Sequence, residues 1–235
     1  CDISGGNVLI DRYQLKIELI DLEDLFGPNI PSPTGYPMGT LGYQHRSSPK
    51  NIFGQWLLEG DRFSAAVLLA EMLTWHDEEI RESAYGEHYF DPREMHQDCG
   101  RYQKLRSTLA TVSSEFPELL ERAWQSDTLS QCPTLNDWAE AIDRCVKSYE
   151  LLEKLEHVIR ADSDRGILHI WQQCNTASKI TNEFKKHQDR VNLAANRVKA
   201  LNKLDSALAT KFVSQILRAY LDQKSLLDAS CTDFI

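Results

Sequence analysis

The chain has 235 residues, of which 42% are hydrophobic and 26% are charged, and its formal net charge is −9 at pH 7. This composition is typical of a globular protein and argues against wholesale disorder. The acidic balance argues against a nucleic-acid or anionic-membrane partner, because such partners are usually bound by a basic face. The best candidate for a membrane span, residues 65–75, is much shorter than the roughly 20 residues that a bilayer requires. We therefore expect neither a nucleic-acid partner nor a membrane partner.

The cysteines and histidines show no pattern of a disulfide framework or a metal site. No Cys-x-x-Cys pair occurs among the six cysteines, which are Cys1, Cys99, Cys132, Cys145, Cys174 and Cys231. Scattered reduced thiols suit a cytoplasmic protein, and we expect that localisation. The spacing of His76, His88, His96 and Cys99 fits no zinc-binding motif, so a solvated, charged connection is the favoured interpretation.

Residues 1 to about 60 have the pattern of strands and turns. Two short β-branched or alternating runs, Val8–Ile10 and Leu15–Ile20, are separated by polar residues. The following stretch, Gly27–Pro37, contains four prolines and two glycines. Proline removes a backbone donor and restricts the residue before it, so we expect an irregular loop here.

From residue 61 the pattern becomes helical. Residues 61–74 are apolar on nearly every face, which predicts a buried core helix. Residues 76–102 are charged and irregular and predict a long surface connection. Further helices are predicted at about 103–112, 117–125 and 135–147. Thr134 and Asp137 resemble a capping box at the start of the last of these.

From about Tyr149 onward the chain is helical in pattern and contains an internal repeat. Six apolar positions recur 49 residues later: Leu152, Leu155, Ile159, Ile167, Leu168 and Trp171 correspond to Leu201, Leu204, Leu208, Ile216, Leu217 and Tyr220. The turn-like residues 162–166 divide the first copy into two helices. We interpret the repeat as two stacked helical hairpins. The alternative is a generic helical bundle whose leucines coincide.

Five polar residues stand in a distinctive order in the first part of the chain. Asp2 is followed five residues later by Asn7, Asp21 comes at the end of the second predicted strand, Thr40 follows the proline-rich loop, and Asp61 opens the core helix. This order resembles the C-terminal lobe of a eukaryotic-like, bacterial-type Ser/Thr protein kinase that is entered in the middle of its catalytic loop. The resemblance covers about residues 1–147.

The resemblance implies a role for each of these residues. Phosphoryl transfer needs a carboxylate that orients the attacking hydroxyl and hard oxygen ligands for Mg²⁺. Asp2 matches the catalytic carboxylate, and Thr40 matches the residue that contacts it. Asn7 and Asp21 match the magnesium ligands, and Asp61 matches the buried Asp that supports the catalytic loop. The implied cofactors are ATP and Mg²⁺.

Two further residues lie in the segment that would be the activation loop. Ser32 and Thr34 each stand next to a proline, and a phosphate on either could be met by Arg46 downstream. The alternative is that they are ordinary polar residues of a loop.

The sequence also departs from the family pattern. Ser4 stands where these kinases carry a phosphate-contacting Lys, and the second metal motif reads Asp21-Leu-Glu23 in place of Asp-Phe-Gly. Ser47 takes the place of the Glu that ends the activation segment. Its usual Arg partner is also replaced, by Gln131 or Cys132. Because both halves of that buried ion pair are absent together, no unpaired charge is left in the core.

No glycine-rich loop, strand Lys or helix Glu of a kinase N-lobe is present. We expect these features in sequence upstream, because the chain begins without Met and inside the catalytic loop. Without an N-lobe, the chain is expected to bind ATP weakly.

The sequence thus predicts a mainly α protein with two parts. Residues 1–147 form a kinase-like C-lobe with a small β-hairpin, and residues 148–235 form a tail of stacked helical hairpins. The predicted function is transfer of the γ-phosphate of ATP to a protein Ser/Thr hydroxyl. The alternative is a catalytically impaired, pseudokinase-like lobe that acts as a regulatory platform. Expected partners are the missing N-lobe, a protein substrate or regulatory partner, and a second copy bound through the tail.

Overall fold

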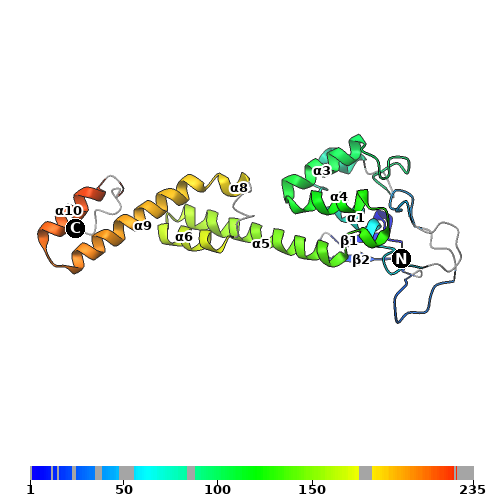
Figure 1. The fold of residues 1–235 in the computed structure, drawn as a ribbon, viewed down its shortest axis with the longest axis horizontal. Coiled ribbons are helices and arrows are strands. Elements are labelled where there is room, and N and C mark those ends of the chain that lie inside the picture. Colours follow the sequence, from blue (N-terminus) through cyan, green and yellow to red (C-terminus); the bar gives the residue numbers. More distant parts are fainter. Residues whose placement is uncertain are drawn as a thin grey trace. The chain divides into compact units, whose positions relative to one another are not determined.

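The computed structural model describes residues 2–11, 13–14, 16–22, 25–34, 39–47, 56–83, 88–174, 182–224 and 226. These residues are mainly helical and include a small two-stranded antiparallel sheet, which confirms the predicted mainly α class (Figure 1). The chain divides into two compact units, Cys1–Cys145 and Val146–Ile235, whereas the predicted boundary followed residue 147. Among the described helices, none is long and apolar enough to cross a membrane.

The first unit begins with a single turn and a β-hairpin. The 3₁₀ turn η1 (Gly5–Asn7) leads into β1 (Val8–Asp11), which pairs antiparallel with β2 (Lys16–Leu19). Val8 lies opposite Leu19, and the carboxylate of Asp11 accepts two backbone N–H bonds at the hairpin turn. The two predicted strands are therefore present, and the hairpin brings Asn7 beside the residue that follows β2.

The core of the first unit surrounds α1 (Arg62–Leu73), which matches the predicted helix over 61–74. It packs against α3 (Gly100–Val112) and α4 (Glu115–Gln125). Fully buried side chains on α1 are Phe63, Ala66, Val67 and Ala70. Small residues at several of these positions let the neighbouring helices approach closely, and the apolar surface that they bury stabilises the unit.

The predicted surface connection over 76–102 was wrong in part. It contains the short helix α2 (Glu78–Ser83) and the start of α3, and its residues Ile80, Phe90 and Tyr102 are buried in the core. Ile80 stands singly among charged residues, and Phe90 has only Tyr89 beside it, so no periodic stripe reveals them. Residues 84–87 of this segment lie outside the described residues.

The last helix of the first unit is longer than predicted. After η2 (Leu129–Gln131), the helix α5 runs from Leu135 to Arg160 rather than ending at 147. Its start confirms the predicted capping pair: the Thr134 N–H donates to Asp137 Oδ2 at 2.8 Å, and the Asp137 N–H donates to Thr134 Oγ1 at 3.1 Å.

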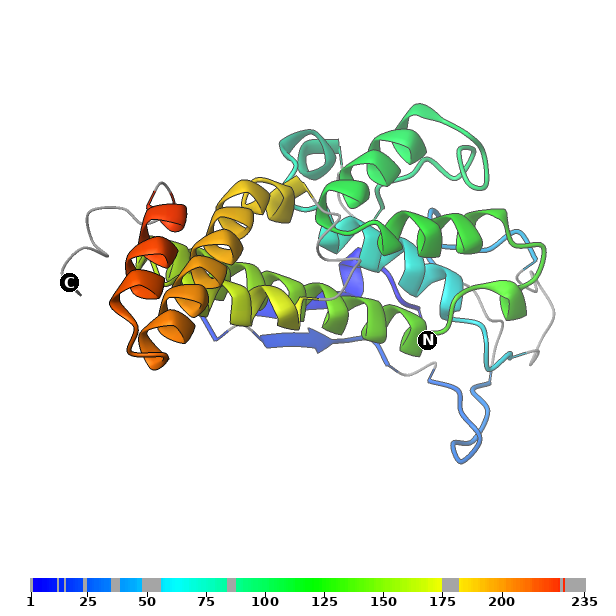
Figure 2. The ribbon, with the colours of Figure 1, turned by 60° about the vertical axis from the view of Figure 1, so that its left-hand side comes forward.

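The second unit contains the end of α5 together with α6 (Asp164–Gln173), α8 (Asn182–Lys185), α9 (Gln188–Ala209) and α10 (Val213–Gln223). The end of α5 with α6 forms one hairpin, and α9 with α10 forms the next (Figure 2). The predicted 49-residue offset recurs in the backbone, because the turn residues Asp162 and Lys211 both have a positive φ, of 50° and 57°. The core of the second unit contains Leu155, Ile167, Phe184, Val191 and Ala194.

Candidate active site

Asp2 and Thr40 are 38 residues apart in the chain and lie in direct contact. The Thr40 N–H donates to Asp2 Oδ1 at 2.8 Å, and the Thr40 hydroxyl donates to Asp2 Oδ2 at 2.7 Å. A Cβ added to Gly39 would stand 3.6 Å from Asp2 Oδ1, so the backbone before Thr40 also lies close to the carboxylate. Two bonds to one carboxylate fix its orientation.

Asn7 connects Asp2 to the segment that contains Asp21. Its side-chain N–H donates to the backbone carbonyl of Asp2 at 2.8 Å, and its own backbone carbonyl accepts the N–H of Ile20 at 3.0 Å. Asp21 follows directly and adopts a left-handed backbone with φ 60°. Few residues other than Gly, Asn and Asp adopt this conformation, and it is enriched at functional sites. The predicted metal ligands therefore stand on adjacent backbone segments, whereas Glu23 of the same motif lies outside the described residues.

A buried hydroxyl–carboxylate pair, Tyr43 and Glu71, supports this site and was not predicted from the sequence. The Tyr43 hydroxyl donates to Glu71 Oε2 of α1 at 2.7 Å, and both side chains are buried. Burial raises the pKa of Glu71 to about 7, against the lowering effects of the Tyr43 hydroxyl and the Tyr89 backbone N–H. The backbone N–H of Gly5 also bonds to the Tyr43 hydroxyl. The Tyr43–Glu71 pair thus connects the Asp2–Asn7 loop, the segment after Thr40 and the core helix.

Asp61 lies at the start of α1, as predicted. Its side chain accepts no bond from the first turn of that helix, so the carboxylate does not act as a helix cap. Burial raises its pKa, and the negative charge of Asp2 raises it further.

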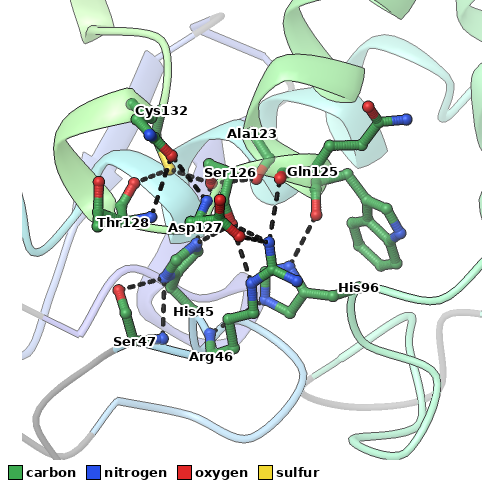
Figure 3. Close-up of polar contacts among 12 residues, drawn as sticks. His45, Arg46, Ser47, His96, Ala123, Gln125, Ser126, Asp127, Thr128 and Cys132 are labelled. Carbon is green, nitrogen blue, oxygen red and sulfur yellow. Dashed lines mark hydrogen bonds and ion pairs between the residues drawn. The ribbon is translucent and has the colours of Figure 1, made fainter.

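The segment 39–47, which contains Thr40 and Tyr43, contacts the C-terminus of α4 through His45 and Arg46 near its own end (Figure 3). The Arg46 side chain donates to the backbone carbonyls of Gln125 and Ser126, at 3.0 and 2.6 Å, and forms an ion pair with Asp127 at 2.8 Å. The last carbonyls of a helix have no partner within the helix, and they carry the negative end of its dipole. Arg46 therefore caps α4 with a positive charge.

The tautomers of two histidines in this network follow from their neighbours. His45 Nδ1 accepts the Ser47 N–H at 3.0 Å, so its Nε2–H faces Ser126, whose Oγ lies at 2.9 Å. His96 Nε2 accepts the Arg46 N–H, so its Nδ1–H donates to the Trp124 carbonyl at 2.8 Å. Burial lowers the pKa of His45 to about 4, with a further lowering by the charge of His96.

This network also joins residues 45–47 to the segment 125–132 that follows α4. The Ser126 hydroxyl contacts Cys132 Sγ at 3.1 Å, and Gln131 Oε1 accepts the N–H of Asp127 at 2.8 Å. Ser47 contacts His45 Nδ1 through its hydroxyl at 2.7 Å and through its N–H at 3.0 Å. The groups around His45 are neutral, and the charged Arg46 beside them is paired with Asp127.

The remaining predicted residues have separate positions. Ser32 and Thr34 are exposed, and the next residues, 35–38, lie outside the described residues. Arg46, the expected phosphate partner, is engaged with the end of α4. In the described part of the chain, no group of three His, Cys, Asp or Glu residues could hold a metal by itself. Trp124 and Trp138 belong to the core.

No match to the chain was found among protein-family models, curated proteins or solved structures.

Proposed function

We propose that the chain is the C-terminal lobe of a protein-kinase-like phosphotransferase. Together with an N-lobe, it would transfer the γ-phosphate of ATP to a Ser or Thr hydroxyl of a protein. The observation that carries this proposal is the two-point grip of Thr40 on the Asp2 carboxylate across 38 residues. A turn residue with no further role would not need a distant partner for both of its oxygens.

Asp2 has the chemistry of the residue that orients the attacking hydroxyl. Its carboxylate accepts a proton or a hydrogen bond, and Thr40 keeps it in one orientation. Because little covalent chemistry falls to the protein in phosphoryl transfer, positioning of this kind is the main contribution of the side chains. Tyr43 and Glu71 hold the backbone on both sides of that contact.

The donor set beside Asp2 fits magnesium. Asn7 uses its amide nitrogen on the Asp2 carbonyl, which leaves Oδ1 as the atom that can ligate a cation, and Asp21 supplies a carboxylate. Mg²⁺ is commonly held by one or two such groups together with phosphate oxygens. When bound, the ion would neutralise charge on the phosphates of ATP.

A second candidate function is a pseudokinase-like regulatory platform. The side chain at the position of the usual phosphate-contacting Lys is Ser4, which is only 2% exposed. It brings no positive charge to the transferred phosphate, so one electrostatic contribution to catalysis is absent. This observation favours a lobe that binds a partner without efficient transfer.

The test is transfer from γ-labelled ATP by the natural protein that contains this chain, compared with three variants. We expect Asp2→Asn to lower the rate by about 10²-fold or more while MgATP binding is retained. Asp21→Asn should weaken MgATP binding itself. Glu118→Gln makes the same acid-to-amide change at an exposed position of α4 and should leave both quantities unchanged. Binding without transfer in the unmutated protein would favour the platform, and absence of both would refute the kinase proposal.

A further inference from the structure

The two hairpins of the second unit differ in what covers them. In the first, Leu155 and Ile167 are fully buried, and α9 packs along α6. In the second, the residue equivalent to Leu168 is Leu217, which is 54% exposed. Leu168 itself is partly buried in the first hairpin, so this face is less covered in the second copy of the repeat than in the first. Apolar residues gathered on one face of a helix usually mark a contact surface.

The charges show that a helix like α9, which packs on the first hairpin, would not fit the second hairpin. Asp162 and Asp164 bind Arg190 of α9, at 2.5 and 2.8 Å. The equivalent positions 49 residues later are Lys211 and Val213. A further helix of the α9 type would bring an Arg towards a Lys, which is unfavourable. A surface that covers the second hairpin would therefore need a charge pattern different from that of α9.

The uncovered surface is the α10 stripe, which consists of Val213, Leu217 and Leu221. These residues are 78%, 54% and 59% exposed and stand four residues apart, so they line one face of the helix. Lys211 precedes the stripe and Asp222 follows it. Within the part of the chain that the structure describes, neither of these two charged residues forms an ion pair.

This arrangement is self-complementary. If two α10 helices pack antiparallel about a two-fold axis at Leu217, the Val213 of one copy meets Leu221 of the other. The same register places Lys211 of each copy opposite Gln223 of its partner, one residue from the partner's Asp222. A closed dimer requires one patch to match itself in this way.

We propose that the α10 stripe is a homodimer interface, formed by antiparallel pairing of α10 from two copies of this chain. The stripe is small compared with the roughly 800 Å² per partner of a standard interface. The dimer should therefore dissociate at micromolar concentrations. This proposal is independent of the kinase proposal, because it uses only residues of the second unit.

The test is sedimentation equilibrium of the 235-residue chain over a range of concentrations. We expect a monomer–dimer equilibrium that Leu217→Glu abolishes. Leu193→Glu makes the same change at an exposed position of α9, outside the stripe, and should leave the equilibrium intact. Circular dichroism checks that both variants keep the helical content of the parent, as expected for changes at exposed positions.

A charge exchange tests the register. Lys211→Glu and Asp222→Lys should each weaken the dimer by about two- to fivefold per ion pair, and the double variant should recover it. A dimer that survives Leu217→Glu, or a double variant without recovery, would overturn the antiparallel pairing. A chain that stays monomeric at every concentration would also overturn the proposal and would show that something else covers the stripe.

Discussion

Replacement of Glu71 by glutamine should change how the stability of the first unit depends on pH. Glu71 is 4% exposed, and burial raises its pKa from 4.5 to about 7. A raised pKa in the folded state means that folding favours the protonated form. The contribution to stability is therefore fully present below pH 4.5 and is lost as pH rises through about 7. At about 1.4 kcal/mol per unit of pKa, this loss is about 3 kcal/mol.

The glutamine of the Glu71→Gln variant would be neutral at every pH, and its carbonyl oxygen would still accept the hydrogen bond from Tyr43. We therefore expect this variant to be about as stable as the parent at about pH 4 and about 3 kcal/mol more stable at about pH 8. His45 responds to pH in the opposite direction, since burial lowers its pKa to about 4. Its contribution is common to both proteins and cancels in the difference.

The assay is urea unfolding followed by tryptophan fluorescence at several pH values. Four of the five tryptophans lie in the first unit, and Trp171 lies in the second. Both proteins should therefore carry Trp171→Phe, so that the signal reports the first unit alone. Parallel stability profiles from about pH 4 to about pH 8 would refute the reasoning, because they would mean that Glu71 titrates alike in the folded and unfolded states.

Three further changes test other parts of the structure. Gly42→Ala should destabilise the first unit by about 1–3 kcal/mol in urea unfolding, because Gly42 has φ 91° and an added Cβ would stand 2.7 Å from His88 Cβ. Normal stability would contradict this. His45→Gln should reduce the loss of stability between about pH 6.5 and about pH 4, because a base with a lowered folded-state pKa stabilises above its ordinary pKa and loses that effect on acidification. An unchanged loss of stability between these two pH values would contradict the role given to the buried His45. Asp164→Asn should lower the unfolding midpoint of the second unit by weakening its ion pair with Arg190, an effect of about 1–2 kcal/mol, measured by circular dichroism. An unchanged unfolding midpoint would mean that the pair of Asp164 and Arg190 does not stabilise the unit.

Much of the fold followed from local pattern. The apolar residues of α1 occupy nearly every face, and the 49-residue offset reappears in the turns at Asp162 and Lys211. Prediction succeeds there because both signals lie in residues that are close together in the sequence or recur at a fixed offset. It failed over 76–102, where Ile80 stands alone and Tyr89 and Phe90 form an isolated pair. Their burial depends on neighbours that are distant in the sequence.

The candidate site divides in the same way. The contact of Asp2 with Thr40 was expected only from the resemblance to protein kinases, because no local pattern links residues 38 positions apart. The Tyr43–Glu71 pair was missed. A signal was present, since Glu71 is the one acid within the apolar run 65–75, and a buried acid requires a hydrogen-bond donor. The sequence did not show that Tyr43 would be that donor.

The most direct test of the account is the effect of Thr40 on phosphoryl transfer by the natural protein that contains this chain. Thr40 positions Asp2, so Thr40→Val should lower kcat for transfer from γ-labelled ATP by about tenfold or more and leave the KM for ATP unchanged. Thr40→Ser keeps the hydroxyl and should restore most of the rate. Equal kcat for the parent and Thr40→Val, or no transfer by the parent itself, would contradict the claim that this contact serves catalysis.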